Sequence, residues 1–97
     1  MAKIDLKHPF PGKSAGDCYK AMLLVVDQAG YKIFKKRDIA WLVICDGKLS
    51  GNNVNLTLAI PFGSPTSVSL SLSCDDLNED SLNIEAERIF SLLDKLI

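Results

Sequence analysis

The sequence contains 97 residues, of which 47% are hydrophobic and 24% are charged. A chain of this length and composition forms one packed domain, which excludes an intrinsically disordered protein. Its formal net charge of −1 disfavours general nucleic-acid binding, and its apolar runs are shorter than the roughly 20 residues that span a bilayer. We therefore predict a single domain over residues 1–97, without a membrane span.

The first predicted elements are a short strand and an amphipathic helix. Ile4 and Leu6 alternate with charged residues, which is typical of a strand, and Pro9 ends it. Ser14 stands at a helix N-cap position, and the helix that it begins reaches Gly30, a common C-terminal stop. The residues that form the apolar stripe of this helix are Cys18, Met22, Val25, Val26 and Ala29.

Four strands and a second helix follow. The strand-like runs cover residues 31–36, 39–45, 54–60 and 67–74. Segment 46–53, DGKLSGNN, predicts a turn, and residues 79–96 predict an amphipathic helix. Short loops between successive strands indicate an antiparallel meander. We therefore expect an α+β two-layer fold, an antiparallel sheet of four to five strands with two helices on one face, in the order β-α-β-β-β-β-α.

Residues 12–14, Gly-Lys-Ser, match the end of a phosphate-binding loop and lie where a helix begins. That loop also needs a glycine five positions before Gly12, and this sequence has Lys7 there. Pro9 and Pro11 remove two of the backbone N–H groups that would hold the phosphates. We therefore interpret the segment as a rigid turn that leads into the Ser14 cap.

The cysteines and the histidine indicate no metal site. Cys18, Cys45 and Cys74 are far apart and lie in apolar stretches, so each is expected to be a reduced core residue. His8 is the only histidine, and no ligand spacing recurs. His8 could serve as a general base, but no partner is placed near it in the sequence, so a solvated loop histidine is the default. We predict no cofactor, no metal and no catalytic constellation.

One face of the predicted sheet carries small polar side chains. Strict alternation in the last two strands points their apolar residues toward the helices and their polar residues away. The polar residues predicted on this open face are Asn53, Asn55, Thr57, Ser67, Ser69 and Ser71. Such residues are also ordinary on a solvated sheet face, which is the alternative interpretation.

The run 39–45 is apolar on both faces, so the open face should also carry a hydrophobic stripe. The stripe consists either of Trp41, Val43 and Cys45 or of Ala40, Leu42 and Ile44. Contiguous exposed apolar surface usually marks an interaction site, and tryptophan is a common anchor there. Trp41 and Val43 are therefore the apolar interface candidates, unless Trp41 lies under the helices.

Charge is unevenly distributed along the chain. Residues 1–48 carry nine Lys/Arg and five acids, a sum of +4, whereas residues 49–97 carry two Lys/Arg and seven acids, a sum of −5. A basic cluster is formed by Lys32, Lys35, Lys36 and Arg37. It could contact an acidic partner or phosphate, or it could protect a sheet edge against aggregation.

These features predict a small non-enzymatic module that associates through its open sheet face, first of all as a homodimer and otherwise with a small protein partner. The alternative is a small carrier that holds an apolar ligand between the sheet and the C-terminal helix. The N-terminal residues lack the apolar run of a signal peptide, which predicts a cytoplasmic protein or a chain whose leader has already been removed.

The predicted order of elements is similar to the fold class of the TATA-box-binding-protein repeat and of the smaller helix-grip proteins. The chain also resembles small bacterial domains in its Gly30-Tyr31 step after the first helix and its Thr66-Ser67-Val68 strand start. The resemblance covers most of the chain and brings no catalytic residues. It implies either an open sheet face that contacts a partner, as the first group uses on DNA, or an apolar ligand between sheet and helix, as in the second.

Overall fold

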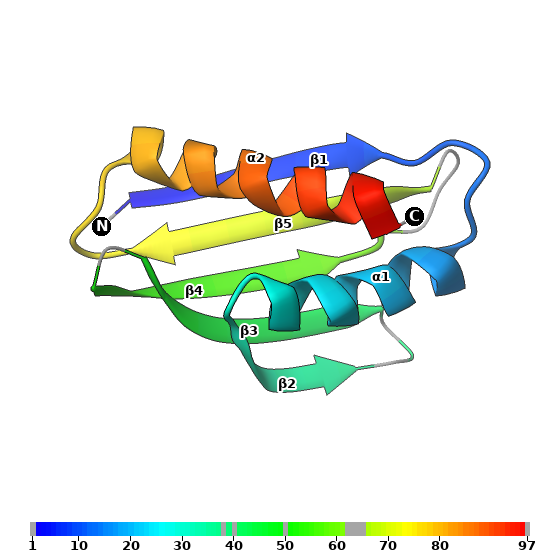
Figure 1. Cartoon of the computed structure of the whole chain (residues 1–97), viewed down its shortest axis with the longest axis horizontal. Coiled ribbons are helices and arrows are strands. Elements are labelled where there is room, and N and C mark those ends of the chain that lie inside the picture. Colours follow the sequence, from blue (N-terminus) through cyan, green and yellow to red (C-terminus); the bar gives the residue numbers. More distant parts are fainter. Residues whose placement is uncertain (1, 38, 40, 50, 62–65, 97) are drawn as a thin grey trace.

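The computed structural model describes residues 2–37, 39, 41–49, 51–61 and 66–96. Its elements are β1 (Ala2–Pro9), α1 (Ala15–Gln28), β2 (Lys32–Arg37), β3 (Leu42–Leu49), β4 (Asn52–Ala59), β5 (Ser67–Cys74) and α2 (Glu79–Leu96). The predicted α+β fold and its order of elements are confirmed (Figure 1). Neither helix of the described chain combines the length and hydropathy needed to cross a membrane.

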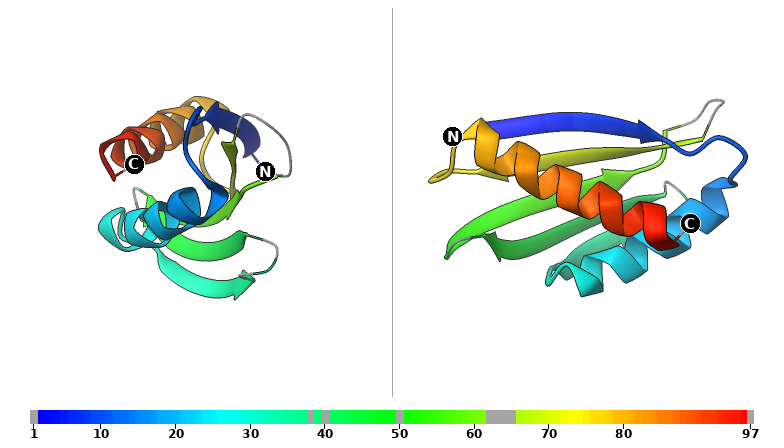
Figure 2. Two further views of the ribbon diagram at one scale, coloured as in Figure 1. Left: turned by 90° about the vertical axis from the view of Figure 1, so that its right-hand side faces the viewer. Right: turned by 45° about the horizontal axis from the view of Figure 1, so that its top comes forward.

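The five strands form one sheet in the order β1-β5-β4-β3-β2, and every neighbouring pair is antiparallel. Strands β2 to β5 form a meander, and β1 adds to its far edge beside β5. Both helices lie on the same side of the sheet, α2 over β1 and β5 and α1 over β2 and β3 (Figures 1 and 2). No described helix or strand covers the opposite side of the sheet.

The core lies between the sheet and the two helices. The register places Val43, Leu58 and Leu70 side by side across three strands, and all three are fully buried. From α2, Leu82, Ala86, Ile89 and Leu93 are buried to the same extent. Each large apolar side chain removed from water in this way stabilises the fold by about 1.5–3 kcal/mol.

Side-chain caps set where the two helices begin. The hydroxyl of Ser14 accepts a hydrogen bond from the backbone N–H of Asp17 at 3.1 Å. The side-chain oxygen of Asn78 accepts one from the N–H of Ser81 at 2.9 Å, at the start of α2. Each cap satisfies a donor that the first helical turn leaves unpaired. Gly-Lys-Ser at residues 12–14 thus leads into a helix cap, as the sequence indicates.

The turn predicted over residues 46–53 is wrong for most of its length. β3 continues to Leu49 and β4 begins at Asn52, with Asp46 opposite Asn55 and Lys48 opposite Asn53. Glycine and asparagine are read as turn formers because they tolerate unusual backbone angles. Among the described residues of this segment, only Gly51, with φ of +81°, uses that tolerance, and residues 46–49 and 52–53 are held in strand conformation by the pairing of β3 with β4.

Candidate functional site

The open face consists of the strand side chains that point away from α1 and α2, and they form rows across the sheet. Successive side chains of a strand alternate between the two faces of the sheet. The residues that stand between the buried ones therefore point to the open face, and the strand register shows which of them lie side by side. From the β1 edge to the β2 edge, the rows are Lys3-Ser73-Asn55-Asp46-Lys32, Asp5-Ser71-Thr57-Ile44-Lys35 and Lys7-Ser69-Ala59-Leu42-Arg37, with Asn53 and Lys48 forming a shorter fourth row.

The small polar residues predicted for this face lie on it. Asn53 and Asn55 are exposed, and Thr57, Ser69 and Ser71 are half-buried between their neighbours. Ser67 lies on the same side opposite Pro9, but only 8% of it is exposed. Ser67 is therefore the one predicted polar candidate that offers almost no surface to a partner.

The two apolar candidates do not lie on this face, so that prediction is wrong. Val43 is fully buried in the core, because its side chain points toward the helices. Trp41 precedes β3 with φ of +51°, and its ring packs edge-on against Tyr19 of α1 at 5.3 Å. The second stripe that the sequence allows occupies the open face: Leu42 and Ile44 are half-buried there. Ala40, its third member, lies outside the described residues.

The predicted basic cluster is divided between the two sides of β2. Lys32, Lys35 and Arg37 pair with open-face residues of β3. Lys36 pairs with Val43 and thus belongs to the opposite face. Lys36 lies opposite its neighbours because successive side chains of a strand alternate, and the register shift between Ile33 and Lys35, which places an extra residue in the strand, brings Lys32 onto the face of Lys35 and Arg37. A bulge of this kind also disrupts the edge, so the edge-protection interpretation of these lysines still stands.

Charge is separated between the open face and the rest of the molecule. The four rows hold six cations against the carboxylates of Asp5 and Asp46, which gives the open face a formal charge of +4. Because the whole chain carries −1, all other residues sum to −5. The side chain of Asp5 accepts a hydrogen bond from the Ser71 hydroxyl. The unequal halves of the sequence thus become two differently charged sides of one molecule.

A hollow of about 410 Å³ lies at the end of the open face where β2 begins and β3 ends. It is lined by Gly30, Lys32, Asp46, Gly47, Lys48 and Asn53. Four of these residues belong to the open-face rows, so the hollow extends that surface. The ammonium groups of Lys32 and Lys48 make this end attractive to negative groups.

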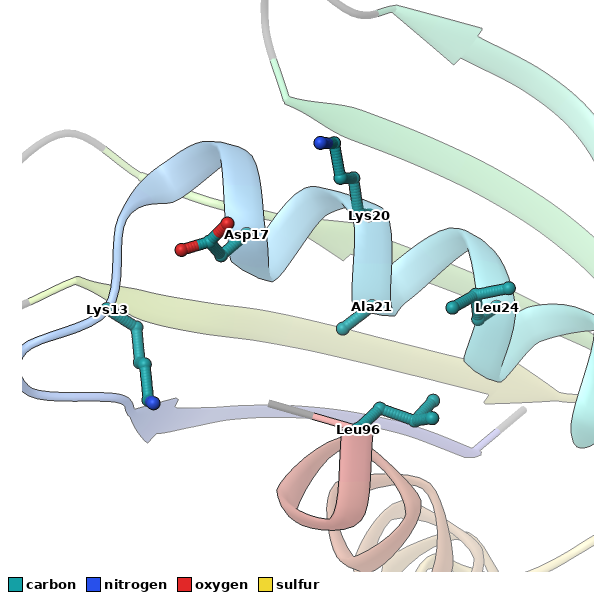
Figure 3. Close-up of a pocket in the computed structure, with 6 residues that line it drawn as sticks. All are labelled: Lys13, Asp17, Lys20, Ala21, Leu24 and Leu96. Carbon is teal, nitrogen blue, oxygen red and sulfur yellow. The ribbon is translucent and has the colours of Figure 1, made fainter.

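A second hollow, of about 300 Å³, lies between the two helices (Figure 3). It is lined by Lys13, Asp17, Lys20, Ala21, Leu24 and Leu96. In Figure 3, Lys13 reaches toward the end of α2, whereas Lys20 points away from Leu96. The charged groups therefore do not converge on a common point, as a site for one polar ligand would require.

The sequence did not reveal a partner for His8, and the structure places one beside it. Nε2 of His8 lies 3.2 Å from Oδ1 of Asp94, which is 86 residues away in the chain. The imidazole stacks on the ring of Phe90 at 5.2 Å and meets the edge of Phe10 at 4.9 Å. No local spacing signals this pair, because it forms only when α2 packs over β1. It fastens the C-terminal end of α2 to the sheet edge.

A buried carboxylate joins α2 to the start of β2. Glu85, whose side chain is 3% exposed, accepts hydrogen bonds from the Tyr31 hydroxyl at 2.7 Å and from Nε and a terminal amino group of Arg88 at 2.6 and 2.8 Å. Arg88 also donates to the carbonyl of Ala29. Burial raises the pKa of Glu85, but the bonds from Arg88 and Tyr31 outweigh burial and hold that pKa below its ordinary value.

This buried network is structural in its geometry, because its groups satisfy one another. Within the described part of the chain, no buried polar side-chain atom lacks a hydrogen-bond partner. The sequence does contain a signal for the network: Glu85 stands three residues after Leu82 and four before Ile89, in the middle of the apolar stripe. A carboxylate at such a position needs a buried partner.

The layer where a carrier would hold an apolar ligand is occupied by the protein's own side chains. The inner residues of α2 are fully buried, as are Leu70 and Leu72 of β5, over which α2 lies. Among the described residues, no three His, Cys, Asp or Glu side chains are grouped to hold a metal ion.

Comparison with known proteins gives a likeness of shape alone. No family model matches the chain, and no curated protein matches it. Among solved structures, the protein TTHA0849 from Thermus thermophilus aligns over 98% of this chain and 94% of its own, with a TM-score of 0.48 and 10% sequence identity.

Proposed function

We propose that this protein is a non-enzymatic binding module that associates through its open sheet face. The observation that carries the proposal is the pattern of that face. Leu42 and Ile44 lie half-exposed among small polar residues, and cations stand at both edges. A surface with an apolar centre and a charged rim is typical of protein interfaces.

The positive charge of the open face favours some partners over others. In a symmetric homodimer, a two-fold axis would set the same patch against itself. Two open faces, each with a formal charge of +4, would then lie against each other. Like charges brought together across an interface are unfavourable by several kcal/mol. A partner of opposite charge is therefore favoured over a second copy of this chain.

Light scattering of the wild type and of two variants, Ile44→Glu and Leu24→Glu, tests this proposal. Leu24 is 55% exposed on α1 and serves as the matched control on the other side of the molecule. We expect a wild-type mass near 10.6 kDa over a wide concentration range. A dimer that Ile44→Glu dissociates and Leu24→Glu preserves would show the homodimeric form of the proposal. A dimer that survives Ile44→Glu would contradict the use of the open face.

A further inference from the structure

We infer that the open face binds an acidic amphipathic helix presented by another protein. The inference rests on the proposed function and adds the chemistry and shape of the partner. Three features of the face support it: the positions of the cations, the presence of carboxylates among those cations, and the short side chains between the edges.

Five of the six cations of the open face stand at its two edges, the sixth, Lys48, lies on β3, and the row residues of β4 and β5 are uncharged. Lys3 and Lys7 lie on β1, and Lys35 and Arg37 lie on β2, at opposite edges of the sheet. Neighbouring strands are about 4.8 Å apart, so the five strands separate the two edges by roughly 20 Å. A partner that satisfies both edges must therefore carry negative charge on both sides of an uncharged or apolar strip.

The mixture of charges favours a protein over a nucleic acid or a lipid surface. Asp5 at the β1 edge and Asp46 on β3 place carboxylates among these cations, and a phosphate backbone or an anionic membrane would be repelled by them. A protein surface can place a cation or a hydrogen-bond donor opposite each of them. Phe34 is exposed at the bulge of β2, but none of the residues in the four rows is aromatic, so these rows lack the series of aromatic rings that holds single-stranded nucleic acid.

The shape of the centre favours a helix. Ser69, Thr57 and Ala59 are short, so another backbone can approach the sheet closely, and Leu42 and Ile44 supply a narrow apolar strip beside them. The other face of the sheet is already covered by amphipathic helices (Figure 2), and a helix on each face is a common way to bury a sheet. A helix that lies along the strands turns one flank toward each edge, and with its side chains it is about 10–12 Å wide.

A titration followed by NMR tests the inference with a defined probe. The probe is a synthetic helix of about 15–20 residues with glutamates on both sides of a leucine and alanine stripe, and its counterpart carries lysines in place of the glutamates. We expect the glutamate peptide to shift the backbone signals of Thr57, Ser69 and Ile44, and the lysine peptide to leave them in place. Added salt should weaken the binding, because the attraction is between exposed charges.

Two charge-reversal variants separate the open face from the general charge of the protein. The variant Lys35→Glu with Arg37→Glu should weaken binding of the glutamate peptide by roughly tenfold or more. The variant Lys13→Glu with Lys20→Glu makes the same change in net charge on the helix side and should alter binding by less than about twofold. Circular dichroism of both variants checks that they remain folded.

Several outcomes overturn the inference, and they differ in what they mean for the proposed function. If duplex DNA or phosphatidylserine vesicles shift the open-face signals and the glutamate peptide does not, the partner class is wrong but the face stands. If the peptide shifts Lys13 and Leu24 instead, its site is the hollow between the helices, and the proposed function fails as well. Equal binding of the two peptides, or no shift at millimolar concentration, also overturns the inference.

Discussion

Trp41 is the residue whose position differs most from what its type suggests. A bulky side chain at positive φ is rare, because its Cβ crowds the following carbonyl at an energetic cost of about 1–2 kcal/mol. The neighbourhood holds Trp41 there: its ring packs on Tyr19, and its carbonyl accepts a hydrogen bond from Ile60 at 3.1 Å. Trp41 thus joins α1 to the beginning of β3 and is not available to anchor a partner on the open face.

We expect Trp41→Glu to lower the free energy of unfolding by about 1–3 kcal/mol, because it removes the ring contact and places a charge against the core. Ile44→Glu, on the open face, should lower it by no more than about 1 kcal/mol. Urea denaturation of both variants measures the difference. Equal losses, or a larger loss for Ile44→Glu, would contradict the placement of these two side chains.

For single residues, the alternation of apolar and polar side chains predicts which face of the sheet a residue occupies wherever the strand backbone is regular. The positions of Asn55, Thr57 and Ser69 follow from period-two alternation alone. Trp41 could not be placed in this way, because a positive φ interrupts the pattern and no residue type announces it. Glu85 could have been found, because a carboxylate in an apolar helical stripe is a conflict that only tertiary contacts resolve.

Strand β3 contains a glycine that is needed for packing. A Cβ on Gly47 would lie 2.5 Å from a ring carbon of Tyr31, closer than two carbons can approach. The missing side chain leaves room for the Tyr31 ring beside the strand, and the hydroxyl of that ring reaches Glu85. Glycine in a strand often marks such a close approach, and this explains why the segment resembles a turn in the sequence and is a strand in the structure.

Gly47→Ala should therefore destabilise the protein by about 1–3 kcal/mol, because the tyrosine ring has to move. Gly16→Ala is the matched control: in the first turn of α1 its nearest contact would be at 3.9 Å. Because alanine is the better helix former, this control should leave stability unchanged or raise it by about 0.5–1 kcal/mol. Thermal unfolding of the two variants gives the comparison, and a harmless Gly47→Ala would show that Tyr31 does not pack as described.

Elements were easier to predict than their ends or their bulges. Both helices and the order of strands follow from periodicity, because apolar spacing reflects which face is buried. The length of β3 and the irregularity in β2 do not, because strand pairing is a contact between distant segments. That irregularity brings Lys32 onto the same face as Lys35 and Arg37 and so decides how many cations the open face holds.

For the molecule as a whole, the Glu85 network sets a dependence of stability on pH. The pKa of Glu85 is lower in the folded protein than its ordinary value of 4.5, because the bonds from Arg88 and Tyr31 outweigh its burial. The folded state therefore favours the ionised form. The resulting stabilisation is complete above the ordinary pKa and is lost as the pH falls through the folded value.

Glu85→Gln should accordingly lower stability near pH 7 by about 1–3 kcal/mol, and its difference from the wild type should shrink as the pH falls below about 4. Glu87→Gln, an exposed position on the same helix, serves as the control and should stay within about 0.5 kcal/mol of the wild type. Chemical denaturation at a series of pH values measures both. A difference that is constant with pH would contradict the lowered pKa of Glu85.

The three buried thiols have a kinetic consequence. Cys18, Cys45 and Cys74 lie on α1, β3 and β5 and are shielded from solvent. Burial, with a contribution from Asp46, raises the pKa of Cys45 to about 12, and burial also raises the pKa of Cys18. Since the thiolate is the reactive form, an alkylating reagent has to wait until the chain opens. The rate at which each cysteine is alkylated therefore measures how often the surrounding part of the native structure opens.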